Sequence, residues 1–182
     1  SLGGGIRDDN ELKAFIPGGG SAPWFFPEHL DMALDPTLVG PAGSMLGSGA
    51  IVAMDETTDM VKACWRLVKF YARESCGKCT PCREGTNWLE TILARIIAGH
   101  GRPEDLDLLL DVSDNISPAP FPGPNVVAGE PAYAPFPYKK TTICDLGPSV
   151  VSPLMSALRH FRPDFEAYIA RNPRKLIGVT SV

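Results

Sequence analysis

The chain has 182 residues, 44% hydrophobic and 21% charged, so it can build one ordinary domain or two small ones with a real core. Its net charge of −4 argues against a nucleic-acid binder, which needs a basic face to meet phosphates. No apolar run is long enough to span a bilayer and no segment resembles a secretory signal, so we expect any membrane association to come through partners. Because the chain opens on Ser1 and a run of glycines, we interpret it as part of a longer polypeptide.

Residues 1–56 are predicted to form a small β-rich piece. Leu12–Ile16 and Ala50–Met54 are short apolar runs flanked by Gly and Pro, a pattern typical of buried or half-buried strands. The glycine-rich turn at Gly18 fits neither a P-loop nor a dinucleotide-binding turn, so we assign it no role in phosphate binding.

Helical periodicity begins near Asp59 and stops at a dense group of cysteines. Apolar side chains recur there every three or four residues and predict one buried stripe. The stripe consists of Val61, Cys64, Trp65, Val68, Tyr71 and Ala72. Thr57 or Thr58 is expected to cap this helix, with Asp59 in its first turn.

Further helices are predicted downstream. Asn87–Ala98 has capping-box spacing at its start and an apolar face that includes Trp88. Another helix is expected from Pro103, because proline is favoured at the first helical position. A fourth is expected to start at Ser152, followed by a short helix over Pro163–Ala170.

Residues 117–138 are rich in Pro, Gly and Ala and are expected to form an exposed loop without regular structure. The helices around this loop define a second predicted unit, residues 57–182. The predicted fold class is therefore α+β, with a β-rich piece followed by a small helical bundle.

The strongest chemical signal is a group of three cysteines, Cys76, Cys79 and Cys82, with C-x2-C-x2-C spacing. A cubane iron–sulfur cluster presents several iron atoms, each of which takes its own thiolate. A short loop with this spacing can reach three of them. The sequence therefore predicts an iron–sulfur cluster at this loop.

The neighbours of these cysteines suit such a site. Gly77 and Gly85 are expected to supply backbone angles that a helix forbids, which frees N–H groups to point at sulfur. Lys78 and Arg83 add positive charge. Donors and charges of this kind shift the reduction potential of a cluster.

A fourth thiolate must come from elsewhere in the chain. We favour Cys144, which lies in a second turn before a predicted helix, over Cys64, which lies on an apolar helical stripe and is expected to pack in the core. Structural zinc is the main alternative for these thiols, although zinc sites usually pair two C-x2-C units or add histidines. Disulfides are disfavoured because an odd number of cysteines without a signal peptide fits a reducing compartment, and unligated surface thiols do not explain such a dense group.

The string E-S-C-G-K-C-T-P-C-R-E-G at residues 74–85 resembles the cluster motif of the flavoprotein subunit of respiratory complex I, that is, of the NADH-quinone oxidoreductase F family. Gly43–Gly49, Asp111–Ile116 and Thr141–Gly147 extend the resemblance. Flavin subunits of NAD-linked hydrogenases and formate dehydrogenases are close relatives, so a diaphorase subunit is the alternative function. A zinc-stabilised interaction module is a second alternative.

The resemblance implies a fold and a cofactor. Residues 1–56 correspond to part of a soluble-ligand-binding β-grasp domain. Residues 57–182 correspond to a helical domain with one [4Fe-4S] cluster, and residues 117–138 to an insertion in it. The family's four cluster ligands fall on Cys76, Cys79, Cys82 and Cys144.

The resemblance also implies an activity and partners. In the intact family member, NADH reduces FMN, and the cluster passes electrons singly to clusters in partner subunits and on to quinone. The expected partners are the small flavoprotein-partner subunit and the large iron–sulfur subunit, at the cytoplasmic face of the plasma membrane. The glycine-rich FMN and NADH segments are absent here, so we expect no catalytic residues and no NADH oxidation by this chain alone. Asp145, next to the last cysteine, is expected to make reduction of the cluster harder.

Overall fold

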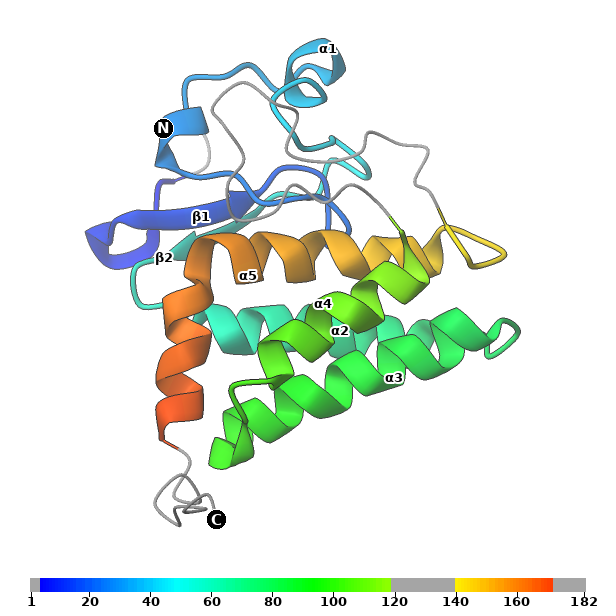
Figure 1. The fold of residues 1–182 in the computed structure, drawn as a ribbon. Coiled ribbons are helices and arrows are strands. Elements are labelled where there is room, and N and C mark those ends of the chain that lie inside the picture. The colour runs from blue at the N-terminus through cyan, green and yellow to red at the C-terminus, as the bar shows by residue number, and fades with distance from the viewer. Residues whose placement is uncertain (1–3, 119–139, 172–182) are drawn as a thin grey trace.

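A computed structural model describes residues 4–118 and 140–171. It shows a bundle of four long helices with a two-stranded sheet against one side (Figure 1). The helices are α1 (Pro36–Val39), α2 (Met60–Glu74), α3 (Thr80–Arg95), α4 (Asp105–Ile116) and α5 (Leu146–Ala170). The strands are β1 (Leu12–Ile16) and β2 (Val52–Asp55). Short helical turns at Arg7–Asp9, Pro27–His29 and Ile96–His100 complete the described elements. The mixed α and β fold class is confirmed.

The two strands are antiparallel, with Leu12 opposite Asp55 and Ile16 opposite Val52. β1 has the predicted bounds, whereas β2 begins two residues later than expected. Because side chains alternate along a strand, Ala14 and Ile16 join the core of the helical bundle while Phe15 packs with Phe25 on the other side. The sheet and the helices therefore share one core.

The glycine turn after β1 has a structural role. The backbone of residues 45–47 crosses directly over Gly18, and the Gly18 carbonyl accepts a hydrogen bond of 3.1 Å from the Ser48 amide. A methyl group on Gly18 would overlap the Met45 carbonyl oxygen and lie 2.5 Å from the Leu46 carbonyl carbon. Only glycine fits at this crossing.

Asp59, rather than Thr57 or Thr58, caps α2. Its carboxylate accepts a hydrogen bond of 3.0 Å from the Lys62 amide. The two threonine hydroxyls instead donate to Asp55, at 2.7 and 3.1 Å, in the turn before the helix. The prediction of a threonine cap was wrong because this turn already uses both hydroxyls.

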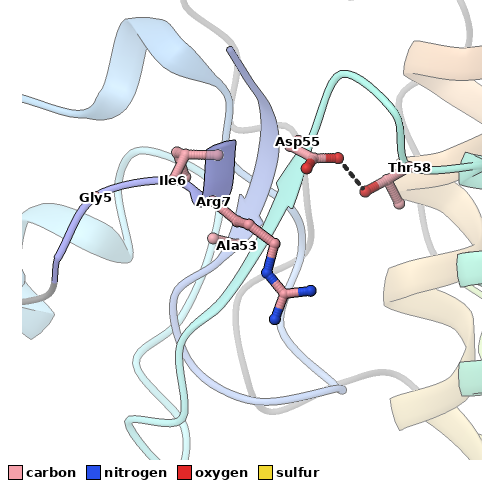
Figure 2. Close-up of a pocket in the computed structure, with 6 residues that line it drawn as sticks. All are labelled: Gly5, Ile6, Arg7, Ala53, Asp55 and Thr58. Atoms are coloured by element: carbon pink, nitrogen blue, oxygen red, sulfur yellow. Dashed lines mark hydrogen bonds between the residues drawn. The ribbon is translucent and has the colours of Figure 1, made fainter. Parts of the chain in front are cut away.

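The turn at Asp55 borders a pocket of about 270 Å³ beside the sheet (Figure 2). Its lining residues are Gly5, Ile6, Arg7, Ala53, Asp55 and Thr58. Hydrogen bonds from Thr57 and Asn10 lower the pKa of Asp55 to about 2, so its charge is held by local turn contacts. We therefore assign the Asp55 carboxylate a structural role in the turn.

The second long helix begins inside the cysteine motif. α3 starts at Thr80, not at Asn87, and Pro81 fits its first turn because amide groups there need no helical partner. The Asn87 side chain donates to the Arg83 carbonyl at 2.7 Å within the helix, so its predicted capping role was wrong. Trp88 is 58% exposed, contrary to the prediction that it faces the core.

Gly85 lies inside α3 with helical backbone, so the prediction that it breaks the helix was wrong. Its role is close packing against α4. A Cβ there would lie 2.7 Å from both Cγ1 and Cδ1 of the buried Ile116. The absence of a side chain lets the two helices approach at this point.

We predict that Gly85→Ala lowers the free energy of unfolding. Overpacking costs about 1–3 kcal/mol, and the better helix propensity of alanine returns about 1 kcal/mol. Urea unfolding of the single variant, of Ile116→Ala and of the double variant measures the coupling. Alanine at position 85 should become neutral or stabilising once Ile116 is truncated. An equal loss in both backgrounds would contradict the packing explanation.

α4 begins at Asp105, two residues after the predicted start at Pro103. The buried Asp105 carboxylate accepts hydrogen bonds from the Arg95 guanidinium and from the Arg102 amide, the latter at 2.9 Å. This ion pair ties the end of α3 to the start of α4. Gly99 has φ +77° inside the helical turn Ile96–His100, just beyond the predicted end of the helix at Ala98.

α5 is longer than predicted and carries both expected segments. It begins at Leu146, so Ser152 is an interior residue and not a cap. Pro153 and Pro163 also lie inside it. A kink at Phe161 (φ −125°, ψ 24°) separates the predicted Pro163–Ala170 segment from the rest, as Figure 1 shows. Within the described residues, no helix has the length and apolar character needed to cross a membrane.

Candidate iron–sulfur site

Three of the predicted ligands lie where α2 passes into α3. Cys76 is in the connecting loop, Cys79 is the residue before α3, and Cys82 is in the first helical turn. Exposure falls in the same order, from exposed Cys76 through intermediate Cys79 to Cys82, which is 4% exposed. The loop therefore presents one sulfur to solvent and holds another against the protein.

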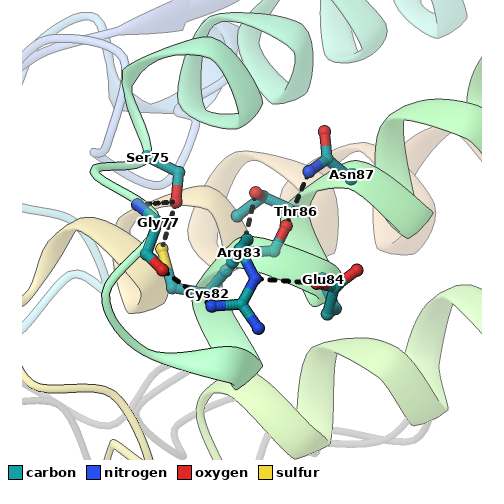
Figure 3. Close-up of polar contacts among 7 residues, drawn as sticks. All are labelled: Ser75, Gly77, Cys82, Arg83, Glu84, Thr86 and Asn87. Carbon is teal, nitrogen blue, oxygen red and sulfur yellow. Dashed lines mark hydrogen bonds and ion pairs between the residues drawn. The ribbon is translucent and has the colours of Figure 1, made fainter.

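Arg83 closes this loop onto the helix (Figure 3). Its Nη1 donates a hydrogen bond of 2.7 Å to the Gly77 carbonyl, and its Nε pairs with Glu84 at 2.8 Å. Gly77 has φ +76°, so the predicted left-handed backbone at this position is confirmed. The Glu84 carboxylate partly neutralises the Arg83 charge. Arg83 therefore contributes more to the geometry of the loop than to the positive charge around the site.

Cys144 lies in the segment just before α5. Thr142 Oγ1 donates to the Cys144 carbonyl at 2.8 Å, and the Thr141 amide donates to the Ile116 carbonyl at 3.2 Å. These contacts fix the segment to the C-terminal end of α4. Of the predicted loop over residues 117–138, residues 119–138 lie outside the described part of the chain, so its lack of structure stays a prediction.

The four cysteines gather at one end of the bundle. Figure 1 shows the loop between α2 and α3 and the start of α5 at the same end. Burial raises the pKa of the Cys82 thiol, and the thiols of Cys79, Cys144 and Cys76 add to the rise, whereas a hydrogen bond from Ser75 opposes it. The loop between α2 and α3 and the segment before α5 therefore bring the four cysteines to the same end of the bundle.

Cys64 has a different environment. It faces the core from α2, is 0% exposed, and burial raises the pKa of its thiol. This placement is that of a small apolar core residue, as predicted.

The surroundings of the four thiols suit a negatively charged group. The N-termini of α3 and α5 both point toward this end, and their first amide groups have no helical partners. Asp145 forms an ion pair of 2.6 Å with Lys140, so the charge expected to oppose reduction is already partly compensated.

Among the described residues, no three His, Cys, Asp or Glu side chains are close enough together to hold a single metal ion. The four thiols therefore lie at the same end of the bundle but do not surround one common centre. Their role as ligands stays a prediction.

Sequence reasoning missed Ser75 at this site. Its Oγ lies 3.3 Å from Cys82 Sγ, and no spacing rule identifies it. Only its position directly before the first cysteine of the motif could have drawn attention to it.

Comparison with known proteins identifies the region. Residues 62–123 match the family described as the NADH-ubiquinone oxidoreductase-F iron-sulfur binding region. The match to this iron–sulfur binding region indicates a [4Fe-4S] cluster. The match includes Cys76, Cys79 and Cys82 but ends before Cys144. The resemblance carried by the cysteine motif is therefore confirmed, whereas Cys144 as the fourth ligand stays a prediction.

Curated relatives extend the similarity along almost the whole chain. The NADH-quinone oxidoreductase F subunit of Streptomyces coelicolor is 45% identical over 168 residues, covering 92% of this chain and 32% of that protein. The corresponding protein of Mycobacterium bovis is 45% identical over 166 residues, covering 91% and 32%. That of Rickettsia massiliae is 38% identical over 167 residues, covering 91% and 34%. The chain thus spans about a third of the length of these relatives.

The fold also has a counterpart among solved structures. The crystal structure of an NAD+-reducing [NiFe]-hydrogenase in the H2-reduced state matches with a TM-score of 0.67 at 24% identity, covering 88% of this chain and 24% of the hydrogenase chain. At this identity the likeness shows the fold.

Proposed function

We propose that Cys76, Cys79, Cys82 and Cys144 ligate one [4Fe-4S] cluster and that this part of the protein relays electrons. The observation that carries the proposal is that Cys144, a cysteine outside the family match, lies just before α5, at the end of the bundle where the loop between α2 and α3 carries the other three. When bound, such a cluster accepts and releases one electron at a time. Partly free N–H groups at the starts of α3 and α5 would offset the negative charge of four thiolates.

The protein supplies an asymmetric setting for this transfer. Buried Cys82 and the core behind it keep water from one side of the site, whereas Cys76 and Cys144 are exposed. The exposed side is where a redox partner can come close. None of these residues makes or breaks a bond in the reaction, so we assign no catalytic residue.

The whole protein is proposed to be the NADH-oxidising subunit of an NADH-quinone oxidoreductase. Its relatives' name and their greater length support a further part that binds NADH and FMN. Electrons would pass from FMN through this region to clusters of the peripheral-arm partner subunits and then to quinone, on the cytoplasmic side of the plasma membrane. We also propose that residues 1–56 are part of a β-grasp domain and residues 57–182 the cluster domain, with a core that the two ranges share; the strand pair supports the β-rich character of the first range.

A diaphorase subunit of a hydrogenase would use the same chemistry with another terminal acceptor. The hydrogenase likeness lies at 24% identity, whereas the NADH-quinone oxidoreductase relatives reach 45%, so sequence favours the quinone enzyme. The genes adjacent to the coding sequence would separate the two functions.

Anaerobic purification of the chain tests the electron-relay proposal. We expect a brown protein with about four iron and four sulfide ions per chain and a paramagnetic signal after reduction with dithionite. A colourless protein with stoichiometric zinc would contradict it and favour a zinc-stabilised module.

A further inference from the structure

Ser75 contacts the most buried of the four thiols. Its Oγ lies 3.3 Å from Cys82 Sγ, as Figure 3 shows. Cys82 is 4% exposed, so water has little access to its sulfur, whereas Cys76 and Cys144 are exposed to solvent. At Cys82 the serine hydroxyl therefore takes the place that water can fill at the exposed sulfurs.

Backbone contacts hold Ser75 in place beside Cys82. Ser75 caps the C-terminus of α2, where its amide donates to the Tyr71 carbonyl at 3.0 Å. The Gly77 amide donates to Ser75 Oγ at 3.5 Å. A cluster-ligating thiolate has no hydrogen and can only accept, so in that state the Ser75 hydroxyl would be the donor to Cys82 Sγ.

We propose that Ser75 is a positioning residue that donates a hydrogen bond to Cys82 Sγ and raises the reduction potential of the bound cluster. This inference rests on the proposed ligand set. A reduced cluster carries one more negative charge than an oxidised one, and part of that charge resides on the sulfurs. A donor to sulfur therefore stabilises the reduced form more than the oxidised form.

The test is a redox titration of the cluster-loaded chain, followed by its paramagnetic signal. For Ser75→Ala we expect the reduced-to-oxidised ratio at a fixed ambient potential to fall by roughly tenfold, which is about 59 mV for a one-electron couple. Ser75→Thr keeps the hydroxyl and should titrate close to the native chain. Ser75→Val has the shape of threonine without the hydroxyl and should shift as alanine does.

Iron and sulfide contents distinguish a failure of the proposed ligand set from a failure of the role proposed for Ser75. A native chain without a cluster would refute the proposed function itself. If Ser75→Ala and Ser75→Val load normally but titrate like the native chain, the hydrogen bond does not tune the cluster. If threonine and valine shift equally, shape rather than the hydroxyl determines the potential, which also overturns the proposal. If only Ser75→Ala incorporates the cluster poorly, the difference in reduction potential between Ser75→Thr and Ser75→Val still tests the role of the hydroxyl.

Discussion

Cys82→Ser is expected to abolish or degrade the cluster. The serine hydroxyl is not ionised near neutral pH, so it is a far poorer iron ligand than a thiolate. Cys82 is also 4% exposed, and solvent has little access to fill the position that its sulfur would leave. The measurement is iron and sulfide per chain after anaerobic purification, together with the visible absorbance of the cluster.

Cys64→Ser is the matched control. It changes the same atom at a site that is 0% exposed and lies in the core away from the loop. It should keep the cluster, although burying an unpaired hydroxyl costs about 1–3 kcal/mol of stability. The ligand set would be wrong if Cys64→Ser lost iron and sulfide while Cys144→Ser retained them.

Gly18→Ala is expected to cause a larger loss of stability than alanine at Gly85 or Gly20. The added methyl group would meet the backbone of Met45 and Leu46, and backbone yields far less readily than the end of a side chain. Overpacking of this kind costs about 3 kcal/mol or more, and it would also strain the bond from the Ser48 amide to the Gly18 carbonyl. Chemical denaturation of the native and variant chains gives the difference.

Gly20→Ala provides the comparison within the same turn. Its Cβ would approach only side-chain atoms, Leu67 Cδ2 at 3.2 Å and Tyr71 Oη at 3.6 Å, which can move slightly. We expect a loss below about 1 kcal/mol there. Similar losses for both variants would show that the backbone crossing at Gly18 is not the cause.

Local patterns predicted the existence of most elements but not all of their starts. The apolar stripe of α2 is correct because its spacing is set by the helix itself. The start of α3 was missed because Gly85 was expected to have backbone angles that a helix forbids. Position 85 has no room for a side chain because Ile116 of α4 packs against it. A contact between two helices cannot be predicted from the local sequence pattern. The same holds for Trp88, whose exposure depends on where α2 and α4 pack.

The site shows the same division between local and distant information. The C-x2-C-x2-C spacing pointed to the chemistry, and the need for a fourth thiolate pointed to Cys144. The contact of Ser75 with Cys82 and the pairing of Arg83 with Gly77 depend on how the chain turns between α2 and α3. Spacing identifies candidate ligands, but the polar groups around them are found only once the backbone is placed.

The attachment of Thr141 to the end of α4 links the position of Cys144 to the helical bundle. The Thr141 amide and hydroxyl both donate to the Ile116 carbonyl, so the placement of Cys144 depends on α4 being in its native position. If the four cysteines ligate a cluster as proposed, loss of its iron would free the segment before α5 from the loop between α2 and α3. A bound cluster would therefore connect the loop between α2 and α3 to the start of the last helix.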